Sequence, residues 1–173
     1  MAVSICTSPV LLRAASPGDE DAIWQILEPV IRAGETYALP RGMSRAEALA
    51  YWLGADRETL VAEADGALVG TYYLRPNQAG GGAHIANCGY MTRLDMTGRG
   101  VARGMCLHSL GHAASRGYAA MQFNFVLASN VRALALWQGL GFQIVGRIPR
   151  AFQHPRLGLV DAFILHRPLS AEN

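Results

Sequence analysis

Residues 97–104, with the sequence Thr-Gly-Arg-Gly-Val-Ala-Arg-Gly, combine the features of a phosphate-binding turn. Glycine lets the backbone approach a ligand closely, and free N–H groups at a helix start bind phosphate with the help of the helix dipole. Arg99 and Arg103 add charged donors. The same glycine cluster also occurs in plain tight turns, so these residues alone leave both interpretations open.

The charges are distributed unevenly along the chain. Residues 96–160 carry seven arginines and no carboxylate, whereas acidic residues outnumber arginines in residues 1–95. A solvated basic face and a site for a polyanionic ligand both produce such an imbalance. We expect no nucleic-acid partner, because only 8% of the residues are aromatic and no nucleic-acid-binding motif is present. A dinucleotide-binding fold is excluded, since no acidic residue follows the glycines at the distance that would hold a ribose.

Two asparagines lie inside otherwise apolar segments that are typical of strands. Asn124 alternates with Phe123 and Phe125, so it would face the opposite side of a strand from both rings. Asn87 lies in the preceding apolar segment. A polar side chain in such a place needs partners. Each amide therefore either satisfies nearby backbone or holds the carboxylate or the reacting amine of a substrate.

Histidines and cysteines give weaker indications. His108 and His112 are four residues apart on a predicted helix, but no third ligand accompanies them, so we expect no metal site. His84 could titrate near neutral pH and act as a base. The three cysteines, at positions 6, 88 and 106, are scattered and odd in number, which favours a reduced cytoplasm over a disulfide framework.

Hydrophobic periodicity and turn residues predict the elements that must position these groups. Strands are predicted at residues 10–14, 59–64, 67–74, 84–92, 119–127, 142–146 and 159–167, and helices at residues 16–33, 44–53, 98–116 and 130–140. The pair Asp65-Gly66 predicts a hairpin. Strands that alternate with helices indicate one α/β or α+β domain.

Composition excludes several classes of protein. The 173 residues are 51% hydrophobic, enough for one core, but no apolar run is long enough to cross a membrane. Residues 1–15 have no basic residue before their short apolar stretch, so we expect no secretory signal. All fifteen basic residues are arginines, and the absence of lysine excludes a Walker phosphate loop and a pyridoxal Schiff base.

Two motifs resemble the acyl-CoA-binding sequences of the GNAT superfamily of N-acetyltransferases. Residues 97–102 are similar to its Gln/Arg-x-x-Gly-x-Gly/Ala signature, with Thr97 in place of the usual first residue. Residues 130–142 are similar to its Asn-x-x-Ala sequence followed by aromatic-x-x-Leu-Gly-Phe. The two motifs occur in the family's order, about 30 residues apart, and the predicted elements fit the family from residue 10 to residue 167.

The resemblance implies a fold and a cosubstrate. The fold is a single α/β (α+β) domain over residues 1–173, with its core at about 10–168. About four helices flank a mixed, mostly antiparallel sheet of about six to seven strands, and splayed central strands hold acetyl-CoA. In this family the amides of the glycine loop hold the pyrophosphate, and the pantetheine arm pairs with backbone near Met91. The implied cofactor-binding residues are Met91, Gly98, Arg99, Gly100, Val101, Ala102, Arg103 and Asn130.

The resemblance also implies acceptor-side residues. Asn87 and the segment around Asn124 resemble the branch of the family that acetylates small amino acids, including proline analogues. We therefore expect Asn87 and Asn124 to be catalytic and to bind substrate. Glu35 and Tyr37 lie in the loop that often covers the acceptor in this family, and they are further substrate-binding candidates.

The usual acid of the family is missing. Many members have a tyrosine where this chain has Trp137, and an indole N–H is no practical proton source. The thiolate would then leave unprotonated or take its proton from water. The base stays open among Glu35, His84 and water ordered by the two asparagines.

We therefore expect a cytoplasmic enzyme that transfers an acetyl group from acetyl-CoA to the amine of a small molecule, an amino acid or an analogue, by direct attack in a ternary complex. A protein N-terminus, an aminoglycoside and a polyamine are alternative acceptors. A non-catalytic CoA-binding regulatory module is a further alternative, which Trp137 keeps open. The expected binding partner is the small-molecule amine, and a homodimer is left open. We expect neither a nucleic acid nor a membrane as a partner.

Overall fold

The computed structural model describes residues 10–169. Cys6 and the first nine residues of the segment considered as a secretory signal lie outside them. The strands are β1 (Leu11–Ala14), β2 (Glu58–Ala64), β3 (Ala67–Pro76), β4 (Ile85–Thr92), β5 (Ala120–Leu127), β6 (Gln143–His154) and β7 (Gly158–Pro168). The helices are α1 (Glu20–Ala33), α2 (Arg45–Trp52), α3 (Val101–Ser115) and α4 (Val131–Gly139).

The strands form one sheet in the order β1-β2-β3-β4-β5-β7-β6. Every neighbouring pair is antiparallel except β4 and β5, which are parallel. Asp65 and Gly66 form the turn between β2 and β3 with positive φ angles of 51° and 74°, as the hairpin prediction requires. The mixed, mostly antiparallel sheet with four helices is thus confirmed.

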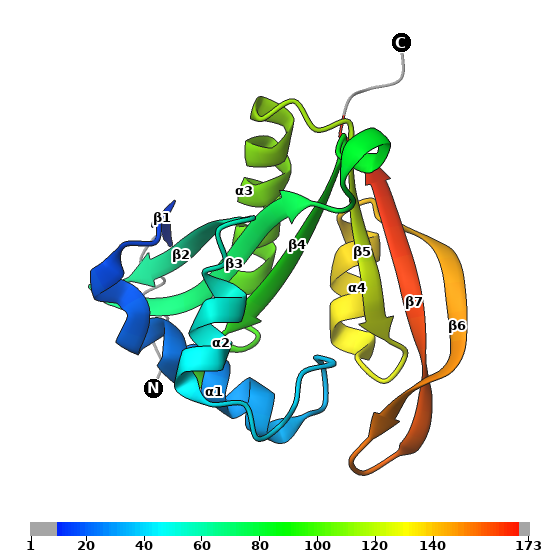
Figure 1. Ribbon diagram of the computed structural model, residues 1–173, viewed down its shortest axis with the longest axis horizontal. Coiled ribbons are helices and arrows are strands. Elements are labelled where there is room, and N and C mark those ends of the chain that lie inside the picture. The colour runs from blue at the N-terminus through cyan, green and yellow to red at the C-terminus, as the bar shows by residue number, and fades with distance from the viewer. Residues whose placement is uncertain (1–9, 170–173) are drawn as a thin grey trace, which may run out of the picture.

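Helices cover both faces of this sheet (Figure 1). On one face α1 and α2 enclose a core cluster that contains Trp52 and Met91. On the other face α3 and α4 enclose a second cluster that contains Met105, Phe123 and Trp137. Residues that alternate along β4 therefore belong to different layers, which separates the environment of Met91 from that of Cys88.

The ends of the helices follow from local sequence. Ser44 and Glu47 form the predicted capping box of α2. α3 begins at Val101, three residues later than predicted, because Gly98 and Gly100 have φ angles of 81° and 84°. Such angles suit glycine and do not continue a right-handed helix. The glycine segment is therefore a loop that leads into α3.

The parallel pair β4 and β5 separates soon after it begins. Only Ile85 with Ala120 and Ala86 with Met121 are in register. Beyond this point the side-chain amide of Asn87 donates to the carbonyl of Gln122 at 2.9 Å, so a side chain replaces the ladder. The two strands then diverge visibly (Figure 1), which confirms the predicted splayed central strands.

The last two strands extend beyond the sequence-based prediction. β6 continues to His154 rather than ending at residue 146, and its register with β7 shifts between Ile148 and Phe152. The shift contains Pro149 and Arg150, whose φ is 52°. Proline is tolerated here because β6 is an edge strand and the ladder is interrupted at this bulge. The proline hides the continuation of the strand in the sequence.

Candidate functional site

A cleft of about 710 Å³ opens where β4 and β5 separate. At one side, which we call the glycine-loop end, it is lined by Thr97, Gly98, residues 100–103, Asn130, Arg132 and Ala133. At the other side, which we call the tyrosine end, it is lined by Tyr51, Tyr73, Arg75, Asn87 and Asn124. No Asp, Glu or His occurs among the described residues that line the cleft, and the charged ones are Arg75, Arg103 and Arg132.

The glycine-loop end presents backbone donors. Gly100 is the N-cap of α3 and its position supplies no capping side chain, so the first N–H groups of the helix receive no bond from this residue. No heavy atom lies within 4 Å of the position that a Cβ at Gly100 would occupy. The loop is therefore open where a ligand would meet the helix dipole.

Arginines reinforce this end of the cleft. Arg103 and Arg132 line it, and Arg132 comes within 3.0 Å of the Cβ position at Gly98. Arg99 lies on the same loop but outside the lining. None of the three forms a salt bridge within the described residues. Arg132 was not a sequence-based candidate, although it lies two positions after Asn130.

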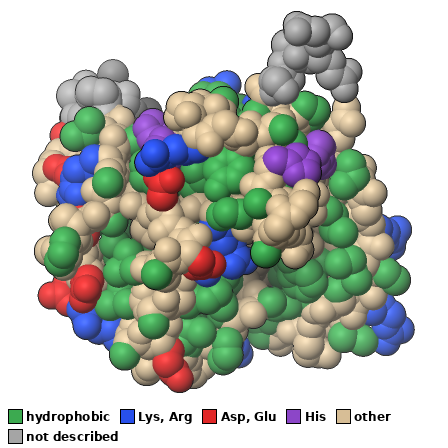
Figure 2. All heavy atoms as spheres, turned by 45° about the horizontal axis from the view of Figure 1, so that its top comes forward, with side chains coloured by type: hydrophobic (Ala, Val, Ile, Leu, Met, Phe, Trp, Pro, Cys, Tyr) green, Lys and Arg blue, Asp and Glu red, His purple; other side chains and the backbone are tan. Residues whose placement is uncertain are grey.

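Three of the other arginines of the basic stretch have carboxylate partners. Arg116 pairs with Glu58, Arg147 with Asp161, and Arg156 with Glu35. On the left half of the face in Figure 2, acidic and basic side chains lie next to each other. The excess of arginine in residues 96–160 therefore has two causes. Part of it faces the cleft, and part balances carboxylates from elsewhere in the chain.

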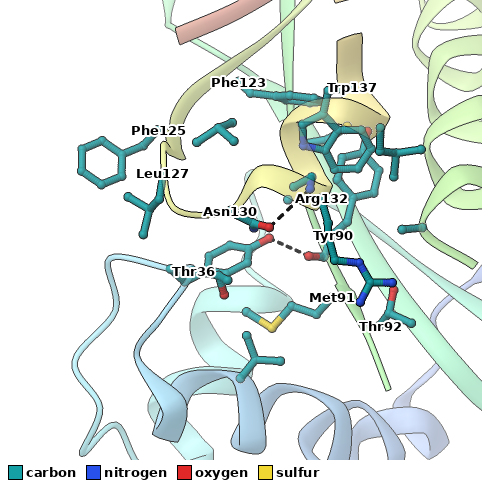
Figure 3. A pocket seen from close by; sticks show the side chains of 18 of the residues that line it. Thr36, Tyr90, Met91, Thr92, Phe123, Phe125, Leu127, Asn130, Arg132 and Trp137 are labelled. Carbon is teal, nitrogen blue, oxygen red and sulfur yellow. Dashed lines mark hydrogen bonds between the residues drawn. The ribbon is translucent and has the colours of Figure 1, made fainter. Parts of the chain in front are cut away.

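α4 forms a wall of the cleft. The Oδ1 atom of Asn130 accepts a hydrogen bond from the N–H of Ala133 at 3.3 Å, which caps the helix. Trp137 is buried, with its ring 5.1 Å from that of Tyr90 and 5.3 Å from that of Phe123. Figure 3 shows Asn130 and Trp137 on this wall and Met91 and Thr92 on the strand that faces it. The indole contributes an aromatic surface to the cleft.

Tyr37 brings the α1–α2 loop to the splayed strand. Its hydroxyl donates to the backbone carbonyl of Tyr90 at 2.8 Å (Figure 3). Tyr37 lines the cleft together with Thr36, Ala38 and Leu39. The loop therefore lies against β4, and the substrate-binding role of Tyr37 stays a prediction.

The structure does not bring Glu35 or His84 to the cleft. The carboxylate of Glu35 pairs with Arg156 at 2.9 Å, beside the turn between β6 and β7. His84 is exposed immediately before β4, and neither residue lines the cleft. Both remain sequence-based candidates without a place at the site.

The two predicted asparagines lie together at the tyrosine end, and both already have partners. Asn87 is buried and donates to Gln122, as described above. Asn124 donates to Oδ1 of Asn77 at 2.6 Å and accepts from the amide of Gln122 at 2.9 Å. The structural role that the sequence left open is thus present. The substrate-binding role of Asn87 and Asn124 stays a prediction.

Three lining residues of the tyrosine end, and Arg57 beside them, were not found from the sequence. Tyr51, Arg57, Tyr73 and Arg75 come from α2, the loop before β2, and β3. Sheet register brings the two β3 residues to the site, because Tyr73 pairs with Gly89 and Arg75 with Asn87. A Cβ at Gly89 would lie 2.7 Å from the Tyr73 ring, so this glycine permits the close approach. Only the long-range pairing of β3 with β4 places Tyr73 and Arg75 at the site, and no local sequence motif contains that information.

The comparisons with known proteins agree with this geometry. Residues 23–142 match the model of the Acetyltransferase (GNAT) family. A GCN5-related N-acetyltransferase from Kribbella flavida is 37% identical, with a TM-score of 0.87 over 92% of this chain and 97% of that one. The chain belongs to the GNAT family of acetyltransferases.

Two further relatives are more distant. N-acetyltransferase aca1 of Schizosaccharomyces pombe is 28% identical over 151 residues, which cover 78% of this chain and 72% of that one. A GNAT superfamily phosphinothricin acetyltransferase from Sinorhizobium meliloti, solved in complex with AcCoA, is 20% identical. It shares the fold at a TM-score of 0.81 over 93% of this chain and 89% of that one. The predicted family and the class of acyltransferase enzyme are confirmed.

Four titratable side chains that line the cleft of this acetyltransferase, Tyr37, Tyr73, Cys88 and Tyr90, keep their protons near neutral pH. Burial raises the pKa of the Cys88 thiol to about 12. Burial also raises the pKa values of Tyr37, Tyr73 and Tyr90 above that of a free tyrosine. These groups donate hydrogen bonds and do not serve as bases at neutral pH.

Two absences are confined to residues 10–169. No group of three or more side chains there is arranged to hold a metal ion. No helix in this part of the acetyltransferase is long and apolar enough to span a bilayer. His108 forms a 2.7 Å hydrogen bond with the hydroxyl of Tyr72 beneath α3, away from the cleft.

Proposed function

We propose that this acetyltransferase transfers the acetyl group of acetyl-CoA to the amine of a small molecule, an amino acid or an analogue, in a ternary complex. The observation that carries the proposal is the composition of the cleft: apolar and amide side chains with arginine as the one charged type among the described lining residues. An acceptor with an anionic group suits such a lining, whereas a polycation is repelled by it.

The glycine-loop end fits the cosubstrate. Open N–H groups at the start of α3 and two lining arginines without carboxylate partners suit phosphates. Beyond Asn87, β4 stays paired with β3 but has no partner strand on its β5 side, and the backbone groups on that side suit the pantetheine arm. Acetyl-CoA supplies a thioester carbonyl that a neutral amine attacks. The residues that would hold it are Met91, Gly98, Gly100, Val101, Ala102, Arg103, Asn130 and Arg132.

The proton of the incoming amine has no side-chain base among the described lining residues. An α-amino group has a pKa of about 8, so a large fraction is neutral just above physiological pH. The amides of Asn87 and Asn124 line the cleft, and in this proposal they order the water that carries the proton away. Trp137 shapes the site and supplies no proton, so the thiolate accepts its proton from solvent.

The same lining disfavours the other acceptors. Aminoglycosides and polyamines carry several positive charges, and sites for them need carboxylates that the described lining does not contain. A protein N-terminus carries one amine and needs an open groove to bind. The acceptor panel described below distinguishes it from a free amino acid. A non-catalytic module would bind the cosubstrate and release no thiol.

A homodimer also remains a proposal. β6 is the outer strand of the sheet, and it exposes Ile144, Val145 and Ile148. Exposed apolar edge strands favour association with another chain. Analytical ultracentrifugation at micromolar concentration would test this.

Thiol release from acetyl-CoA, followed with a thiol reagent, tests the proposed function. The acceptor panel contains amino acids and their analogues, polyamines, an aminoglycoside and peptides with free N-termini. We expect turnover with one or more amino acids and none with spermidine or the aminoglycoside. Turnover confined to peptides, or cosubstrate binding without thiol release on any acceptor, would contradict the proposal.

A further inference from the structure

Two arginines share one carboxylate at the tyrosine end. The Arg57 guanidinium forms a two-pronged contact with Asp56, with Nε at 2.8 Å and Nη2 at 3.1 Å from its oxygens. Arg75 reaches the same carboxylate with one terminal nitrogen at 3.3 Å, a longer and weaker contact. These bonds lower the pKa of Asp56 to about 2. Two positive charges therefore face one negative charge, and the cluster keeps a net charge of +1.

The cluster has donors that its own carboxylate does not satisfy. Nη1 of Arg57 and Nε of Arg75 are buried and lack a hydrogen-bond partner within the described residues. Buried donors without partners are rare in folded proteins. The Arg57 side chain is only 7% exposed, whereas Arg75 is 30% exposed and lines the cleft. Arg75 is thus the member of the pair that can contact a ligand.

Aromatic rings hold the pair in place. The Arg57 guanidinium lies 5.0 Å from the centre of the Tyr51 ring and 4.7 Å from that of Tyr73. Such cation–π contacts, with the bonds to Asp56, keep Arg57 buried. Arg57 is therefore a positioning residue. It orients Asp56 and the two rings, while Arg75 extends towards the cleft.

The position of Arg75 relates it to the acceptor. Arg75 and Asn87 are directly opposed on β3 and β4, so their side chains lie on the same face of the sheet. Asn87 marks the point at which β4 and β5 separate. The charged cluster thus lies beside the end of the cleft that is away from the glycine loop.

We propose that Arg75, supported by Arg57 and Asp56, binds the carboxylate of the acceptor amino acid and makes this enzyme selective for amines that carry one negative charge. The inference rests on the proposed function, because it names the group of the same acceptor that the cleft recognises. The net charge of +1 matches a monoanion. A nearby arginine also disfavours the ammonium form of the acceptor, which promotes the neutral amine that reacts.

The test compares each amino acid of a panel, L-proline and L-alanine included, with its own carboxamide. The readout is the ratio of kcat/KM for the two forms at saturating acetyl-CoA. We expect the wild-type enzyme to prefer the carboxylate form about 10- to 100-fold, as for a hydrogen bond to a charged group. Arg75→Gln should remove this preference and leave the KM of acetyl-CoA unchanged, and Arg75→Lys should retain part of it. Arg45→Gln, which removes an arginine paired with Asp21 on the outside of α2, is the matched control.

The outcomes separate this inference from the proposed function. An Arg75→Gln enzyme that keeps the wild-type preference overturns the carboxylate site and leaves the function intact. If no acceptor is turned over, but calorimetric titration in the presence of CoA shows amino-acid binding that Arg75→Gln abolishes, the site stands and the proposed function falls. If no amino acid of the panel is turned over or binds, both fall.

Discussion

The two ends of the cleft recognise ligands by different means. At the glycine-loop end the donors are backbone N–H groups, and the nearby Arg103 and Arg132 have no carboxylate partner among the described residues. At the tyrosine end the polar groups are side chains that already bond to each other, as Asn124 does with Asn77 and Arg75 with Asp56. One end is open and main-chain based, and the other is a preformed network of side chains.

This difference matches what each end has to do. Backbone donors keep their positions whatever the neighbouring side chains are, which suits a cosubstrate that a whole family shares. Side chains that fix one another present a defined pattern of charge and amides, which suits the acceptor that a single enzyme selects. Substitutions at the glycine-loop end should therefore change binding of the cosubstrate, and those at the tyrosine end should change selectivity and turnover.

The largest effect is expected at the glycine loop. Gly100→Val should weaken binding of acetyl-CoA by about 100-fold or more, because valine strongly disfavours a φ of 84° and its branches would cover the N–H groups. Calorimetric titration measures the affinity. Gly104→Ala is the control, since Gly104 lies on α3, outside the lining and with open space around it. An unchanged affinity for the Gly100 variant would show that this loop does not hold the cosubstrate.

The asparagines of the tyrosine end come next. Asn87→Ala and Asn124→Ala should each reduce kcat by about 10- to 100-fold, within the usual range for proton-transfer groups, with little change in the affinity for acetyl-CoA. Asn87→Ala should also lower the free energy of unfolding by about 1–3 kcal/mol, because the Gln122 carbonyl loses its donor. Steady-state kinetics and urea denaturation separate the two effects. Wild-type turnover in both variants would remove the asparagines from the mechanism.

The sequence predicts the glycine-loop end far better than the tyrosine end, for a physical reason. Gly98, Gly100 and Arg103 are neighbours in the chain, so one short motif describes the loop. Arg57 and Arg75 come together through the pairing of β2 and β3. The Asp65-Gly66 turn predicts that these strands pair, but the bulge between Ala62 and Glu63 shifts their register, and no local pattern encodes that bulge. Periodicity predicts the order of strands and helices. It does not predict β6 beyond Pro149, where an edge bulge continues the strand.

Arginine substitutions sharpen the comparison at the glycine-loop end. Arg103→Ala and Arg132→Ala should each raise the KM of acetyl-CoA by about 10-fold at low salt, because each removes a charged donor from the lining. Arg99→Ala should have a smaller effect, since Arg99 lies outside the lining. Kinetics at two ionic strengths provide the measurement. An Arg99 effect that exceeds both others would mean that the loop changes conformation on binding.

Trp137→Phe tests whether the wall of the cleft contributes shape or chemistry. Phenylalanine keeps an aromatic contact with Tyr90 and Phe123, so kcat should stay within about threefold of wild type, well short of the losses typical for a removed acid. Turnover at saturating acetyl-CoA measures this. A loss of about a thousandfold with intact cosubstrate binding would give the indole N–H a direct role in the reaction.

The smallest effect is expected where the structure keeps titratable groups away from the cleft. Glu35→Gln and His84→Gln should change kcat by less than about twofold, and the kcat/KM of both should rise with pH to about 8, as an α-amino acceptor loses its proton. Ionisation of Cys88 or Tyr37 should cause no loss of activity up to about pH 10. The Cys88 thiol has a pKa of about 12, and the pKa of Tyr37 is raised above that of a free tyrosine. Since Glu35 pairs with Arg156, Arg156→Gln serves as the control for any loosening of the loop. Full pH–rate profiles decide the matter. If Glu35→Gln or His84→Gln abolishes turnover and removes the acidic limb while the asparagine variants resemble wild type, a side-chain base replaces solvent as the proton acceptor.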